Sequence, residues 1–139
     1  FLIFIIMPPP KGHFTPCLYV SATTNAYQIT TTEGEIINKP KIFEGATVPI
    51  MNFLGVCHAL HYLEKKGEFM PIYTNLITTI AWVKKCECGT TVAQNDSLFN
   101  SILNAEEFLK SHRKELLFVT KWETKEWGEI PTTFEKFKL

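Results

Sequence analysis

Carboxylates are the side chains best suited to metal-dependent chemistry, and this chain carries them in an uneven proportion. Thirteen of its fourteen acidic residues are glutamate, and the only aspartate is Asp96. Many hydrolytic and phosphoryl-transfer sites hold Mg²⁺ through at least one short, stiff aspartate. Any such site in this chain must therefore use Asp96 or rely on glutamates alone.

Cysteine and histidine offer a second possible chemistry. Cys86 and Cys88 form a C-x-C pair, and His58 and His61 are three residues apart, so that they roughly share one face of a helix. Structural zinc sites usually combine two spaced pairs of ligands, so a single C-x-C predicts zinc only weakly. We interpret these residues as structural and predict no metal site. The sequence also shows no Ser–His–acid pairing above chance and no glycine-rich phosphate loop.

Length and composition indicate what kind of domain must position any such residues. The chain has 139 residues, of which 45% are apolar, which suits one domain with a substantial core. Fourteen basic residues balance fourteen acidic ones, so there is no long-range attraction to nucleic acid or to an anionic membrane. Four cysteines are too few for a disulfide scaffold.

The first ten residues differ from the remainder. Phe1–Met7 is entirely apolar, and Pro8–Pro10 forms a stiff, extended spacer. Seven apolar residues are too few to span a bilayer, which needs roughly 20, so we predict no membrane role and expect an added strand or a packed segment. The predicted organisation is an apolar segment with a proline linker over residues 1–10 and one domain over residues 11–139.

Hydrophobic periodicity and turn residues predict the elements of this domain. Strands are expected at 17–23, 25–32, 35–43, 70–74 and 116–121. Pro40 confines the third of these to a sheet edge or a bulge. Helices are expected from Pro49 to a basic C-terminus at Lys65–Gly67, at 76–85, after a cap at Asn95 and Asp96, and at 129–138.

Three segments in this order carry a family resemblance: NFLGVCHALHYLEKKG, PIYTNLITTIAWVKK and KWETKEWGEIP. Together they resemble ribonuclease H type I, closest to the bacterial variety in which the nuclease follows a hybrid-binding domain and a proline-rich linker. The resemblance covers about residues 8–138. It implies an α/β fold whose mixed five-stranded sheet has three antiparallel strands and then two parallel ones, with helices on both faces. It also implies cleavage of the RNA strand of RNA–DNA hybrids by two Mg²⁺ ions held by four carboxylates.

Neutral residues occupy all four positions where the resemblance implies those carboxylates. They are Ser21, Asn52, Asn75 and Thr133. The formal charge there falls from about −4 to zero, and neutral ligands alone hold Mg²⁺ poorly. Glu129 matches an acid beside the family's metal site. It could form a residual one-metal site, but a solvated acid is the favoured interpretation, because one carboxylate rarely fixes a catalytic Mg²⁺.

The best surviving nucleic-acid feature follows the second predicted helix. Thr90 and Thr91 match the Ser-Thr pair with which the family binds a DNA phosphate, and Lys84 and Lys85 precede them. The alternative is a loop whose hydroxyls cap local backbone groups. Glu87 interrupts the basic cluster, which weakens the nucleic-acid interpretation.

Three hypotheses follow. The first is a non-catalytic ribonuclease H-like domain that binds nucleic acid or a protein partner without any cofactor. The second is an active hybrid ribonuclease with a rebuilt Mg²⁺ or Mn²⁺ site around Glu129. The third is a structural or dimerising partner without nucleic-acid contact, which uses Phe1–Met7 to extend a sheet edge. The resemblance and the lack of an intact export signal lead us to expect a cytoplasmic location.

Overall fold

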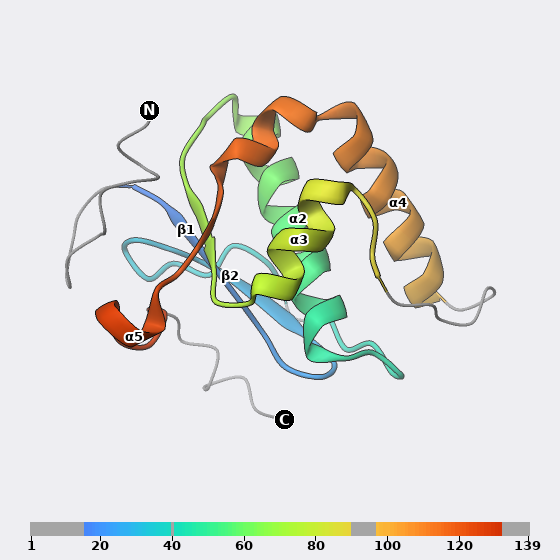
Figure 1. Cartoon of the computed structure of the whole chain (residues 1–139), viewed down its shortest axis with the longest axis horizontal. Helices are drawn as coiled ribbons and strands as arrows, with labels where there is room; N and C mark the ends of the chain where they lie inside the picture. The colour runs from blue at the N-terminus through green and yellow to red at the C-terminus, as the bar shows by residue number, and fades with distance from the viewer. Residues whose placement is uncertain (1–15, 40, 90–96, 132–139) are drawn as a thin grey trace.

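The computed structural model describes residues 16–39, 41–89 and 97–131, and these form an α/β fold around one mixed sheet (Figure 1). The four strands are β1 (Leu18–Ala22), β2 (Tyr27–Thr31), β3 (Ile72–Thr74) and β4 (Val119–Lys121). The helices are α2 (Val48–Lys66), α3 (Ile77–Lys85), α4 (Ser97–Ser111), the 3₁₀ helix η1 (Arg113–Phe118) and α5 (Thr124–Trp127).

The strands lie in the order β2-β1-β3-β4. β1 and β2 are antiparallel, whereas β3 and β4 run parallel to β1. Side chains alternate between the two faces of β1, as the period of a strand requires. Leu18 and Val20 join the main core, and Tyr19 joins a separate aromatic cluster.

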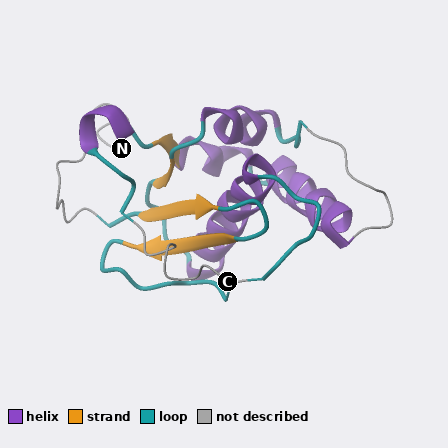
Figure 2. Ribbon diagram, turned by 90° about the horizontal axis from the view of Figure 1, so that it is seen from below, coloured by secondary structure: helices purple, strands orange, loops and turns teal. Residues whose placement is uncertain are grey.

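Helix α2 covers one face of the sheet and is central to the core (Figure 2). Its ends follow the signals in the sequence. The Thr47 hydroxyl accepts from the Ile50 amide, Pro49 lies in the first turn, and Gly67 ends the helix in the left-handed region at φ 67°. Gly55 allows the helix to approach the sheet closely, because a Cβ there would lie 2.7 Å from Val20 Cγ1.

The other face of the sheet carries aromatic residues. Tyr19, Tyr73 and Trp122 are all nearly fully buried there. Trp127 of α5 packs at a ring-centroid distance of 4.9 Å from Trp122, whose Nε1 donates to the Gly128 carbonyl at 2.8 Å. Within the described ranges, helices lie on both faces of the sheet, as expected, but the two faces are not covered to the same extent. The long helices cover one face, and only the four-residue α5 packs on the other.

The expected third strand is wrong for the described residues, so that the sheet has four strands and not five. Only an isolated bridge between Thr30 and Ile36 marks its place. Part of the reason is that the Asn38 side chain bonds the backbone of β2 where a partner strand would otherwise do so. Asn38 Oδ1 accepts from the Ile29 amide at 2.7 Å, and its Nδ2 donates to the Tyr27 carbonyl at 3.0 Å. These side-chain bonds, together with backbone bonds from the Thr31 amide to the Glu35 carbonyl and from the Ile37 amide to the Ile29 carbonyl, satisfy the edge of β2 without a continuous partner strand.

The last predicted strand is shorter than expected. Residues 113–118 form η1, and only Val119–Lys121 pair with β3. Residues 129–131 are not helical, and the remainder of the predicted final helix lies outside the described residues, as do Pro40, the Asn95–Asp96 cap and the whole of 1–15. In the portion of the chain that is described, no helix has both the length and the apolarity needed to cross a membrane.

Candidate functional site

The carboxyl ends of the three parallel strands gather the predicted site residues. Val20, Thr74 and Lys121 are aligned across β1, β3 and β4. Ser21 and Asn75 follow the first two of these, so they lie at the same edge of the sheet. Such edges are the usual position of sites in open α/β sheets.

Helix α2 brings a third predicted residue to this edge. The Thr74 hydroxyl donates to Asn52 Oδ1, so that the carboxamide is tied directly to the end of β3. Both side chains are fully buried. The structure therefore brings Asn52 against the strand that Asn75 ends. Thr133, the fourth predicted position, lies outside the described residues.

Burial differs sharply among these positions. Asn52 is 0% exposed, Ser21 is 9% exposed, and Asn75 is exposed. The Nδ2 of Asn52 has no hydrogen-bond partner among the described residues. Leaving a buried amide unpaired costs roughly 1–3 kcal/mol, so Asn52 is packed into the core at some expense.

The electrostatics of this edge do not favour a cation. Lys121 follows Val119 and Thr120 at the end of β4, and its ammonium lies 3.4 Å from Glu123 Oε1. Glu123 is thus paired with a lysine, and Glu129 is exposed. Within residues 16–39, 41–89 and 97–131, no group of three or more His, Cys, Asp or Glu side chains is placed to hold a metal ion.

Lys84 and Lys85 occupy different environments at the end of α3. Lys84 Nζ donates to the Leu116 carbonyl at 3.1 Å and so ties α3 to η1. Burial lowers the pKa of Lys84. Both lysines are exposed, and Thr90 and Thr91 lie outside the described residues. Because Lys84 already bonds a carbonyl, Lys85 is the stronger candidate to contact a phosphate.

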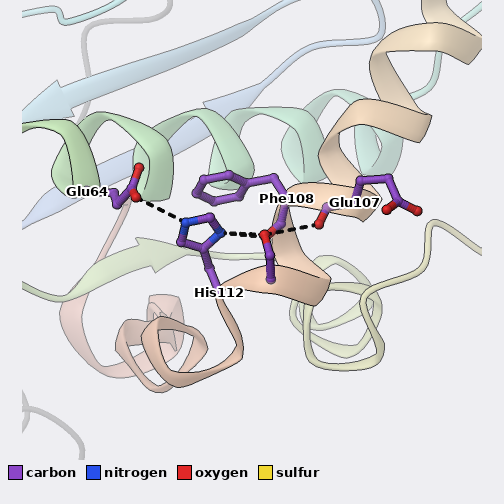
Figure 3. Close-up of polar contacts among 5 residues, drawn as sticks. Glu64, Glu107, Phe108 and His112 are labelled. Atoms are coloured by element: carbon purple, nitrogen blue, oxygen red, sulfur yellow. Dashed lines mark hydrogen bonds and ion pairs between the residues drawn. The ribbon is translucent and has the colours of Figure 1, made fainter.

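The structure also brings together a Ser–His–acid arrangement that the sequence did not reveal (Figure 3). Ser111 Oγ lies 2.9 Å from His112 Nδ1, and His112 Nε2 lies 3.1 Å from Glu64 Oε2. Glu64 is 48 residues from His112, so no spacing rule could have paired them. The distances resemble those of a hydrolytic triad.

The hydrogen bonding excludes that role. Ser111 donates to backbone carbonyls of its own helix, and His112 Nδ1 lies 2.8 Å from the Phe108 carbonyl oxygen. A carbonyl and a carboxylate only accept, so both ring nitrogens of His112 donate and neither is free to act as a base. Partial burial lowers the pKa of His112, but the bonds to the Phe108 carbonyl and to Glu64 outweigh it and the net pKa is raised. The arrangement is a clamp between α2 and the end of α4.

The cysteines and the two histidines of α2 pack within the fold or contact neighbouring side chains. All four cysteines are free, and Cys17, Cys57 and Cys86 are buried. His58 Nδ1 lies 2.7 Å from the Tyr27 hydroxyl, and the His61 ring packs edge-on against Phe108. No known protein-family model matches the chain.

Proposed function

We propose that this chain is a non-catalytic ribonuclease H-like domain that acts as a binding module. The strand order β2-β1-β3-β4, with one antiparallel pair followed by parallel strands, supports this. It is the order that the resemblance implies, without the outer strand. The Ile36 bridge stands where that outer strand would pair with β2.

The observation that carries the proposal is the Asn52–Thr74 hydrogen bond. At the position where the resemblance implies a metal-binding glutamate, the chain has a fully buried carboxamide bonded to the sheet. Its oxygen is already used by a hydroxyl, and it carries no charge. Ser21 and Asn75 are neutral as well.

Charge arithmetic explains why these replacements silence the reaction. Two dications about 4 Å apart repel by roughly 4 kcal/mol in bulk water and about 17 kcal/mol at an effective dielectric constant of 20. Four carboxylates offset that repulsion in an active site. Neutral oxygens cannot, and Mg²⁺ gives up its water reluctantly.

The lysines at the C-terminal end of α3 bear on which ligand the module binds. Lys85 is exposed beside the start of the segment that holds Thr90 and Thr91, whereas Lys84 is committed to the Leu116 carbonyl. In a chain of zero net charge, this short basic segment supports weak nucleic-acid binding at most. A protein partner or a second copy of the chain is the alternative ligand.

A cleavage assay tests the loss of activity. The protein is incubated at high concentration with an RNA–DNA hybrid and Mg²⁺ or Mn²⁺. We expect no cleavage above a buffer blank. Cleavage that Glu129→Gln abolishes would refute the proposal and establish the rebuilt-site hypothesis.

A binding assay then identifies the ligand class. Hybrid, duplex DNA and single-stranded RNA are titrated separately and followed by fluorescence anisotropy, with sedimentation analysis of the oligomeric state alongside. Binding of any nucleic acid identifies that ligand. A monomer that binds none of them would leave only a protein partner.

A further inference from the structure

A pocket of about 400 Å³ lies between β2, α2 and α4. This volume falls in the range of roughly 300–1,000 Å³ that is typical of small-molecule sites. Ten residues from three elements and one loop line it: Tyr27, Phe43, Leu54, Cys57, His58, His61, Ser101, Asn104, Ala105 and Phe108.

Three aromatic rings from separate parts of the fold form its sides. Tyr27 comes from β2, Phe43 from the segment before α2, and Phe108 from α4. The Phe108 ring is held between His61, at a centroid distance of 5.4 Å, and His112, at 3.9 Å. Phe43 is 7% exposed, and its amide donates to the Asn25 carbonyl at 2.8 Å. These walls are therefore preformed.

Polar groups are placed along the same pocket. Ser101 and Asn104 come from α4, and His58 and His61 come from α2. The Tyr27 hydroxyl holds His58 Nδ1 at 2.7 Å, which leaves Nε2 as the ring atom open to a ligand. Hydroxyl, amide and imidazole groups can both donate and accept.

The pocket has no lysine, arginine or carboxylate in its lining. Burial, together with the neighbouring His61, lowers the pKa of His58 and so disfavours a positive charge on that ring. A charged ligand would leave water without a lysine, arginine or carboxylate to pair with, and this is costly.

We propose that this pocket binds an uncharged, planar heteroaromatic ring, of which a nucleobase is the biological example. Aromatic side walls stack on the faces of such a ring, and the hydroxyl, amide and imidazole groups bond its polar edge. The inference goes beyond the proposed function and does not depend on the missing carboxylates. The base can come from a free nucleoside or from a nucleic-acid strand.

Titration with the four common ribonucleosides tests the proposal, with calorimetry and ligand-observed NMR as readouts. We expect at least one nucleoside to bind with a Kd below about 1 mM. Its 5′-monophosphate should bind no more tightly, because neither lysine nor arginine lines the pocket. A homopolymeric tetranucleotide of the same base that binds at least tenfold more tightly identifies a strand as the source. Equal affinities identify the free nucleoside. The absence of binding by every nucleoside overturns the proposal.

A matched pair of variants on α4 locates the site. Ser101→Phe places a ring in the pocket, whereas Asn100→Phe places the same ring at an exposed position that does not line it. We expect Ser101→Phe to weaken binding at least tenfold and Asn100→Phe to leave it unchanged. If Ser101→Phe does not fold, Asn104→Leu at the exposed rim should weaken binding at least threefold. Retention of full affinity in the pocket variant, or equal loss in both, overturns the proposal.

Discussion

Removing the Thr74 hydroxyl tests how Asn52 is held at the edge of the sheet. In Thr74→Val, Asn52 Oδ1 loses its donor and the Leu76 amide loses an acceptor at 3.3 Å. Each hydrogen bond contributes about 1 kcal/mol net, and the Asn52 carboxamide would remain fully buried without a partner. We therefore expect the free energy of unfolding to fall by about 2–3 kcal/mol. Urea denaturation followed by circular dichroism measures this.

Thr79→Val is the matched control. Thr79 is also 0% exposed, but its hydroxyl has no hydrogen-bond partner within the described part of the chain. The same replacement should therefore change the free energy of unfolding by less than about 1 kcal/mol, in the stabilising direction. Equal destabilisation by the two variants would refute the reasoning, because the loss would then reflect the valine and not the contact with Asn52.

Three further predictions concern other parts of the fold. Gly55→Ala should lower the free energy of unfolding by about 1–3 kcal/mol in a thermal melt, since its Cβ would meet β1 at 2.7 Å. Glu64→Gln should cost less than about 1 kcal/mol, because the pair is partly exposed. Because the pKa of His112 is raised in the folded state, the loss of stability in Glu64→Gln should be greatest below the unfolded-state pKa of about 6.5. It should disappear as the pH rises through the folded-state pKa. Denaturation of both proteins at about pH 5.5 and at about pH 8.5 would detect this difference. Lys85→Glu should weaken any nucleic-acid binding in an anisotropy titration and reduce its salt dependence.

Local signals predicted the elements that depend on local chemistry. Proline in the first turn, two terminal lysines and Gly67 placed α2 correctly, because capping is decided within a few residues. The strand at Ile72–Thr74 was also predicted, and it is two residues shorter than the range 70–74. The third strand was wrong because two backbone bonds and the Asn38 side chain satisfy part of the edge of β2, and β-propensity does not record such a side-chain contact.

For the candidate site, too, the sequence predicted the positions of residues along the chain but not their tertiary partners. The sequence predicted Ser21 within the first strand and Asn75 directly after the strand at 70–74, and the structure has Ser21 in β1 and Asn75 after β3. The partners of the buried groups could not be predicted, since they depend on tertiary contacts. Lys84 bonds a carbonyl 32 residues away. The pocket between α2 and α4 likewise joins residues from across the chain. Of its lining residues the sequence singled out only His58 and His61, and then as weak candidates for zinc.

The most direct test of the central claim is a calorimetric titration of the protein with Mn²⁺ and Mg²⁺, repeated in the presence of an RNA–DNA hybrid. A variant that combines Ser21→Asp, Asn52→Glu, Asn75→Asp and Thr133→Asp serves as the comparison. We predict no saturable binding of either ion to the natural chain and measurable Mn²⁺ binding to the variant, because only the variant has anions to offset the charge of the cations. Binding of two divalent ions per molecule of the natural chain would contradict the account.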